Sequence, residues 1–141
     1  MLPFCGYNMG EYFAHWLKIG KSTDKNKLPK IFHVNWFRKD ANGKFLWPGF
    51  GDNIRVIKWI FEQCDVDAHS IKTPIGLLPD KDAIDISNLN VDSRTMEELL
   101  KVDRNDWKKE VENIREYYKI FGDDLPTELS EELNALEKRL I

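Results

Sequence analysis

The sequence has few of the features that mark disordered, disulfide-bonded or membrane-spanning proteins. Its 8 glycines and 6 prolines in 141 residues are far below the share found in low-complexity tracts. Two cysteines, Cys5 and Cys64, are too few for a disulfide framework and are typical of a reducing compartment. No apolar run approaches the ~20 residues that span a bilayer, and no basic patch precedes an apolar stretch as in a signal peptide. We therefore expect a soluble, cytoplasmic domain with no membrane partner.

The sequence also has no large excess of charge of either sign. It carries 21 Lys and Arg against 24 Asp and Glu, a formal net charge of −3. This balance argues against extensive binding to a nucleic-acid backbone. Hydrophobic residues make up 42% and charged residues 32%, which allows a packed core inside a polar surface. The length fits one ordinary domain.

Recognisable catalytic motifs are absent. The chain has no H-E-x-x-H, C-x-x-C, Walker loop or G-x-S-x-G sequence. Its three histidines, His15, His33 and His69, fall in a predicted helix, strand and loop without paired ligand spacing. We therefore expect neither catalytic residues nor metal ligands within this chain.

Aromatic residues are plentiful but unevenly placed. They make up 12% of the chain, and six lie between Phe32 and Phe61, whereas none lies from Cys64 to Lys101. The crowding occurs around Pro48, Gly49 and Gly51, residues that break regular structure. We therefore expect the stretch 45–51 to be a shaped loop.

Apolar spacing predicts that the chain is mainly helical. The expected helices run from Met9 to Gly20, from an Asp52 cap to about Gln63, over Thr95–Leu100, from Asp103 to Gly122, and onward from Pro126. The second helix is expected to bury one face, and the last carries a leucine stripe. These two apolar sets are Val56, Ile57, Ile60 and Phe61, and Leu129, Leu133, Leu136 and Leu140.

Strand signals are fewer. Ile31–Phe37 is rich in β-branched and aromatic residues and alternates, with Phe32, Val34 and Trp36 on one face. Asp40–Gly43 is a turn signal, and Ser70–Leu78 is predicted to be one short strand limited by Pro74 and Gly76. A linker at 21–30 and a polar loop at 79–90 connect these elements. The expected fold is α+β, mainly helical with two or three short strands.

The aromatic loop is the candidate binding site. Phe37, Phe45 and Phe50 surround a glycine-containing turn, and Asn53 follows. Rings placed in this way can stack on a flat heterocycle, while an asparagine amide offers a donor and an acceptor to the edge of a purine. The loop glycines would let a ligand approach the backbone closely. Composition alone also permits a second interpretation, in which the rings pack on one another and merely fix the loop.

The chain resembles GTP-dependent phosphoenolpyruvate carboxykinase. The resemblance is carried by FLWPGFGDN at 45–53, preceded by KIFHVNWFRK at 30–39. PFCGYN at 3–8 and YFAHWL at 12–17 match upstream, and TPIG at 73–76 and the final helices match downstream. The similarity covers essentially the whole chain, from Pro3 to about Leu140. The fold would then be the C-terminal part of a larger α/β nucleotide-binding domain.

The resemblance implies a function and a site. The family converts oxaloacetate and GTP into phosphoenolpyruvate, CO₂ and GDP with Mn²⁺ or Mg²⁺, in gluconeogenesis or anaplerosis. Its guanine pocket carries over as three phenylalanines and the segment that lines the base, with Trp36 packing behind. Asp52 stands where the family usually has Glu, and Cys5 where it often has a second Phe. The implied guanine-binding residues are Phe37, Phe45, Phe50, Gly51, Asp52 and Asn53.

The same resemblance implies what this chain lacks. The family's P-loop, its manganese ligands, its substrate arginines and its mobile lid all lie N-terminal to the matched part. We therefore expect a C-terminal fragment of a monomeric enzyme, inactive alone, whose partners are the guanine nucleotide and the missing N-terminal part. Residues 1–64 would form the guanine-pocket region, 65–91 a strand and loop linker, and 92–141 the C-terminal helices.

Two alternatives from other classes compete with this interpretation. Arg38, Lys39 and Lys44 interleave with the aromatics, a composition that a small single-stranded RNA-binding module also uses. The C-terminal helices could instead form an interaction bundle, although their leucine stripe is more simply a face that packs inside the domain.

Overall fold

The computed structural model describes residues 2–65 and 69–141. Within this part the chain is mostly helical and has one two-stranded antiparallel sheet, which confirms the α+β class with two short strands. None of its helices is long and apolar enough to cross a membrane. The helices and strands are α1 Met9–Ser22, α2 Asn53–Asp65, β1 Ser70–Thr73, β2 Gly76–Pro79, α3 Ser93–Leu100, α4 Arg104–Tyr118 and α5 Thr127–Arg139. The 3₁₀ segments are η1 Leu2–Phe4, η2 Lys25–Lys27, η3 Phe50–Asp52 and η4 Lys119–Asp124.

The chain forms two compact units. The first combines Met1–Pro29 with Asp103–Ile141, and the second is Lys30–Val102. The functional division into 1–64, 65–91 and 92–141 follows different boundaries and stays a prediction. The candidate binding loop lies entirely within the second unit.

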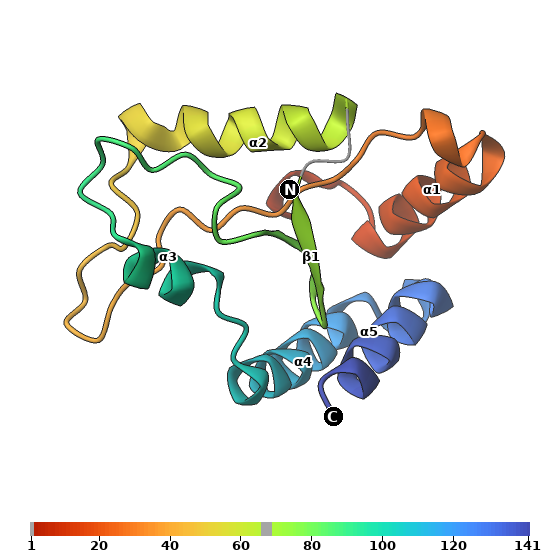
Figure 1. The fold of residues 1–141 in the computed structure, drawn as a ribbon. Helices are drawn as coiled ribbons and strands as arrows, with labels where there is room; N and C mark the ends of the chain where they lie inside the picture. Colours follow the sequence, from red (N-terminus) through yellow and green to blue (C-terminus); the bar gives the residue numbers. More distant parts are fainter. Residues whose placement is uncertain (1, 66–68) are drawn as a thin grey trace. The chain divides into compact units, whose positions relative to one another are not determined.

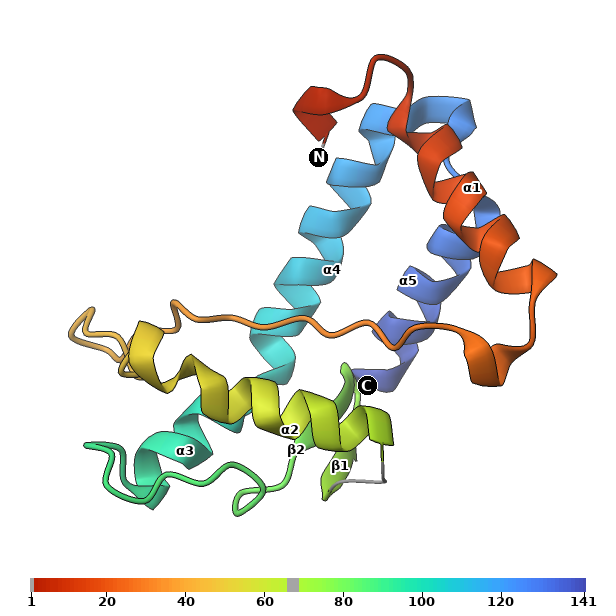
Figure 2. The same cartoon turned by 90° about the horizontal axis from the view of Figure 1, so that it is seen from above.

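In the first unit, α4 and α5 lie side by side (Figures 1 and 2). Asp103 caps α4 as predicted, because its carboxylate accepts from the backbone N–H groups of Asn105 and Asp106. The predicted leucine stripe faces inward, since Leu133 and Leu140 are buried with Val111. The stripe is therefore an internal packing face of this unit.

Helix α1 joins this unit through its first turn. Asn8 caps the helix by accepting from the Gly10 N–H at 2.8 Å, and its own amide donates to the Phe121 carbonyl at 3.0 Å. The Phe13 and Phe121 rings meet edge to face at 5.4 Å. Beyond α4, the chain turns within η4 at Gly122, the residue predicted to stop the helix, whose φ of 56° favours glycine.

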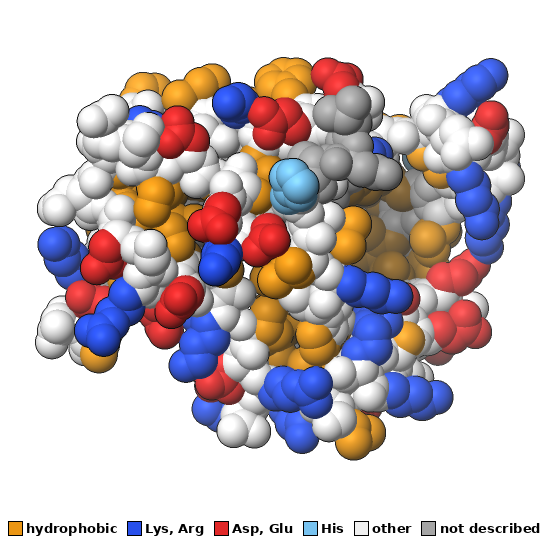
Figure 3. Space-filling model, in the orientation of Figure 1, with side chains coloured by type: hydrophobic (Ala, Val, Ile, Leu, Met, Phe, Trp, Pro, Cys, Tyr) orange, Lys and Arg blue, Asp and Glu red, His pale blue; other side chains and the backbone are white. Residues whose placement is uncertain are grey.

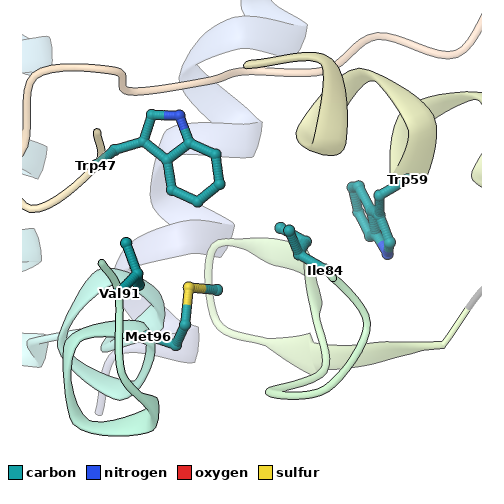
Figure 4. Close-up of a cluster of buried hydrophobic side chains, with 5 residues drawn as sticks. All are labelled: Trp47, Trp59, Ile84, Val91 and Met96. Atoms are coloured by element: carbon teal, nitrogen blue, oxygen red, sulfur yellow. The ribbon is translucent and has the colours of Figure 1, made fainter. Parts of the chain in front are cut away.

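The second unit has its own core, which joins α2 and α3 to two loops (Figure 4). Trp47 enters from the aromatic loop, Trp59 from α2, and Met96 from α3. The long loop after the β1–β2 hairpin runs alongside α2 and adds Ile84 and Val91 (Figures 1 and 4). Although polar in composition, this loop therefore contributes two of the buried residues.

The predicted buried face of α2 is only half right. Val56 and Ile60 pack against the core, but Ile57 and Phe61 are exposed, at 37% and 64%. The buried residues of the helix are instead Trp59 and Gln63, because the helix is rotated to place the large indole in the core. Hydrophobic side chains consequently reach the surface along the edge that α2 occupies (Figure 3).

The predicted strand at Ile31–Phe37 is wrong. This segment pairs with no strand, and only an isolated bridge joins Lys39 to Phe45. The alternation is nevertheless correct, since Phe32, Val34 and Trp36 are half-buried while their neighbours are exposed. An extended segment becomes a strand only when a neighbouring backbone supplies hydrogen bonds, and the described part of this chain supplies none there.

The single strand predicted at Ser70–Leu78 is also wrong, because the segment folds back on itself. Thr73 pairs with Gly76 across a two-residue turn at Pro74 and Ile75. The Thr73 hydroxyl donates to the Gly76 carbonyl at 2.7 Å, and Gly76 takes a φ of 129° that suits glycine. The residues expected to limit one strand thus create a hairpin of two.

Candidate functional site

The candidate site begins with a tight turn that brings two predicted rings together. The Asp40 carboxylate accepts from the backbone N–H groups of Asn42 and Lys44, at 2.8 and 2.9 Å. The Leu46 N–H donates to the Arg38 carbonyl at 3.0 Å. This turn matches the prediction at Asp40–Gly43 and folds the segment before it onto the segment after it.

Phe37 and Phe45 are neighbours as a result. Their centroids lie 6.1 Å apart at an interplanar angle of 61°, an edge-to-face contact. The rings are nevertheless 72% and 50% exposed, and the Lys39 ammonium lies 4.9 Å from the centre of the Phe45 ring. This pair is a partly open aromatic surface with a positive charge at its edge.

Phe50 lies apart from that pair. Its side chain is 97% exposed and makes no ring contact within the described residues. It begins η3, where the preceding Gly49 takes a φ of 110° that strongly favours glycine. The structure therefore brings together two of the three predicted rings and presents the third to solvent from the next turn.

Asp52 does not have the capping role that the sequence predicts. It belongs to η3, which runs directly into α2, and its carboxylate pairs with the Arg55 guanidinium at 3.4 Å. Arg55 also donates to the carbonyls of Asp85 and Ser87, at 2.8 and 3.1 Å. This arginine therefore ties the candidate site to the loop that follows the hairpin.

Arg55 pairs with a second carboxylate besides that of Asp52. The Asp85 carboxylate lies 3.6 Å from the guanidinium and accepts from the Ser87 N–H at 2.8 Å. Hydrogen bonds from Ser87 hold the pKa of Asp85 below its ordinary value of 3.8, and the positive charge of Arg55 acts in the same direction. Asp85 is therefore ionised at neutral pH and remains a partner for Arg55.

The Asn53 side chain is held by the indole of Trp47. It is half-buried at the start of α2, and its Oδ1 accepts from the Trp47 indole N–H at 2.9 Å. Sequence reasoning selected Asn53 but missed the role of Trp47. The signal was available, because a buried tryptophan needs an acceptor and Asn53 follows six residues later.

Two further residues support the loop from behind. Trp36 is half-buried and packs against the core of the second unit, while its place behind a guanine pocket stays a prediction. Arg38 donates to the carbonyls of Leu99 and Lys101, at 3.1 and 3.0 Å. Because this guanidinium is bound to the protein, it is poorly placed to contact a nucleic-acid phosphate.

Other candidate chemistry does not converge on this loop. In residues 2–65 and 69–141, no group of three His, Cys, Asp or Glu side chains could hold a metal ion. A surface groove lies on the first unit, and none of the six implied site residues lines it. It is lined by Lys108, Lys109, Val111, Glu112, Asn134, Glu137, Lys138 and Ile141.

The geometry of the loop is that of a candidate base-binding site. Exposed aromatic rings offer stacking surfaces, and a half-buried amide offers hydrogen bonds at an adjacent position. The class of protein that this loop and the α+β fold indicate is a segment of a nucleotide-binding domain.

Comparison with known proteins gives the family. Residues 1–139 match the family described as phosphoenolpyruvate carboxykinase C-terminal P-loop domain, and the chain belongs to that family. It is 56% identical to the phosphoenolpyruvate carboxykinase [GTP] of Neocallimastix frontalis, and 52% identical to those of Chlamydia caviae and Treponema pallidum (strain Nichols). Each comparison covers 99% of this chain and 23% of the relative.

The chain therefore spans about a quarter of the length of these relatives. The resemblance stated from the sequence is confirmed, because the family match extends over nearly the whole chain. The alternatives, an RNA-binding module and a helical interaction domain, receive no support from the comparisons.

Proposed function

We propose that this chain supplies the guanine-binding site of a GTP-dependent phosphoenolpyruvate carboxykinase. The observation that carries the proposal is the exposed aromatic loop, with Phe37, Phe45 and Phe50 at 50–97% exposure beside the fixed amide of Asn53. Rings exposed to this degree contribute little to packing of the loop and are accessible for stacking on a base. Family membership supplies the nucleotide, since the curated relatives are named for GTP.

The chemical role of the site is to hold the base. Each base–aromatic stack contributes ~1–3 kcal/mol, and edge hydrogen bonds select between purines. Gly51 would lie against the ligand and Asp52 would hold Arg55, so that the six implied residues act as one loop. A fixed base orients the γ-phosphoryl group for transfer to the enolate that decarboxylation of oxaloacetate produces.

The rest of the reaction belongs to the part of the enzyme outside this chain. We propose that the remainder holds the Mn²⁺ or Mg²⁺ ion, the phosphates and oxaloacetate, so that these 141 residues alone are inactive. The exposed face of α2, at Ile54, Ile57 and Phe61, suits contact with that remainder. The complete enzyme is proposed to be a cytoplasmic monomer of gluconeogenesis or anaplerosis. Below, "the full-length enzyme" means this chain joined to the remainder that its relatives carry.

Replacing Asn53 tests the proposed function directly. In the full-length enzyme, Asn53→Ala removes the group that would contact the base edge, and one such hydrogen bond is worth ~1–2 kcal/mol. We expect the GTP-to-ATP ratio of kcat/KM to fall roughly tenfold, while the KM for oxaloacetate stays unchanged. Steady-state kinetics with both nucleotides measure this.

Asn113→Ala is the matched control. Asn113 is an exposed asparagine of α4, in the other unit, whose amide donates to Glu110 at 3.1 Å. Its variant should keep the wild-type nucleotide ratio. An unchanged GTP-to-ATP ratio in Asn53→Ala would refute the role of Asn53, and unchanged nucleotide constants in both Asn53→Ala and Phe50→Ala would refute the site.

A further inference from the structure

The bond between Trp47 and Asn53 has a chemical consequence for which purine the site accepts. The indole Nε1 of Trp47 carries a hydrogen and has no acceptor capacity. The Asn53 atom 2.9 Å from it must therefore be the carbonyl oxygen, whichever way an amide could otherwise be turned. The Asn53 Nδ2 group, with its two donors, consequently points away from Trp47.

Trp47 is itself firmly placed. Its side chain is only 6% exposed and belongs to the core cluster with Val91 and Met96. Figure 4 shows both residues against one side of the indole, with the nitrogen on the opposite edge. The core therefore fixes the position of the N–H, and the N–H fixes the rotation of the Asn53 amide.

We propose that Trp47 is a positioning residue that makes Asn53 present donors to the base. This rests on the proposed function, because it requires the base to lie at the aromatic loop. Guanine and hypoxanthine carry a carbonyl acceptor at position 6, whereas adenine carries an amino donor there. With Oδ1 directed at Trp47, Asn53 presents its Nδ2 donors to the base; they bond a 6-carbonyl and leave the adenine 6-amino group facing another donor, which opposes binding.

The test uses three nucleotides and the full-length enzyme. Trp47→Phe removes the N–H and keeps an aromatic ring, so the Asn53 amide can rotate and offer its oxygen to adenine. We expect the GTP-to-ATP and ITP-to-ATP ratios of kcat/KM to fall together, by about tenfold, while the GTP-to-ITP ratio stays constant. A constant GTP-to-ATP ratio would overturn the proposal.

Trp59→Phe is the matched control. Trp59 lies in the same core, is also 6% exposed, and its indole donates to the His69 carbonyl at 3.3 Å. Trp59→Phe loses the same side-chain volume as Trp47→Phe does, and it also loses an indole hydrogen bond. The bond that it loses is to His69 and not to Asn53. Equal falls in the nucleotide ratios of both variants would show that general core damage is responsible and would overturn the proposal.

The Asn53→Ala variant distinguishes a positioning role of Trp47 from a general packing role. If Trp47 acts through Asn53, then Trp47→Phe should lower the GTP-to-ATP ratio no further in a protein that already carries Asn53→Ala. A further tenfold loss there would overturn the proposal. Should Trp47→Phe fail to fold, 3-benzothienylalanine at position 47 keeps the bicyclic shape and replaces the N–H with sulfur, and the same results are expected.

Failure of this inference is distinguishable from failure of the proposed function. If Asn53→Ala lowers the GTP-to-ATP ratio but Trp47→Phe leaves it constant, the base site stands and the positioning role is wrong. If neither Asn53→Ala nor Phe50→Ala changes any nucleotide constant, the proposed site itself is wrong and the inference falls with it.

Discussion

The three phenylalanines of the candidate site are far more exposed than the rings that build the core. Phe50 is 97% exposed, whereas Phe121, in the other unit, is 1% exposed. A phenylalanine contributes to stability only when its ring leaves water, so a fully exposed ring adds little to the fold. The ring of Phe50 is therefore accessible to the proposed base or to the remainder of the enzyme, as is the ring of Phe4, which is 91% exposed.

Phe50→Ala is expected to weaken nucleotide binding without weakening the fold. Loss of one base stack costs ~1–3 kcal/mol, so the KM for GTP in the full-length enzyme should rise at least several-fold. The melting temperature should stay within about a degree of the wild type, because the ring makes little contact. Steady-state kinetics measure the KM for GTP, and calorimetry measures the melting temperature. An effect confined to kcat would contradict simple stacking.

Gly51 offers a sharper test of ligand proximity. A Cβ at this position would meet no atom of the chain within 4 Å, and its φ lies outside the left-handed range. Gly51→Ala should therefore preserve or slightly raise stability, by up to ~1 kcal/mol. It should nevertheless raise the KM for GTP several-fold if the base approaches this backbone.

Gly20→Ala is the companion variant, since a Cβ at Gly20 also meets nothing within 4 Å and lies outside the loop. It should share the effect on stability and leave the KM for GTP unchanged. Equal nucleotide constants for Gly51→Ala and the wild type would place the ligand away from this glycine.

At the scale of elements, periodicity predicts the helices well. The cap at Asp103, the start of α5 after Pro126 and the turn at Gly122 lie where local chemistry requires them. The faces of α2 and the pairing of 31–37 are not local properties. They depend on the segments that pack against α2 or pair with 31–37. The alternation of apolar residues at 31–37 indicates which side chains are half-buried, but it does not show that the backbone pairs with another strand.

The same distinction applies to the site. The aromatic loop and Asn53 could be predicted from the sequence, because the three phenylalanines and the asparagine lie within the 17 residues from Phe37 to Asn53. The Arg55 contacts to Asp85 and Ser87 were not, since they join residues 30 and 32 positions apart. Such contacts follow from the path of a loop, which no period in the sequence encodes.

Helix α1 supplies a prediction about packing. A Cβ on Gly10 would overlap the Asp124 carbonyl oxygen and lie 2.7 Å from its carbon, so the two backbones must separate. Gly10→Ala should therefore destabilise the chain by at least ~1 kcal/mol, although alanine favours helices. Gly20→Ala, in the same helix with open space around it, should instead stabilise by ~0.5–1 kcal/mol. Denaturant unfolding of both variants measures the contrast, and equal shifts would contradict this close approach.

At the scale of the whole molecule, both compact units lie within the same family match. The family match runs from residue 1 to 139 and so includes both the unit with the aromatic loop and the helical unit. The chain spans about a quarter of its relatives, and an apolar face of α2 remains exposed. Both facts agree with a segment whose proposed role is to bind the base while the remainder performs the chemistry.

Photo-crosslinking is the most direct test of whether this chain carries the guanine site. The full-length enzyme is irradiated with 8-azido-GTP, and the labelled peptides are mapped by mass spectrometry. We expect that label concentrates in the peptide containing residues 37–53, that excess GTP abolishes it, and that an equal concentration of ATP does not. Label confined to other parts of the enzyme, or label at 37–53 that GTP fails to displace, would contradict a guanine site in this chain.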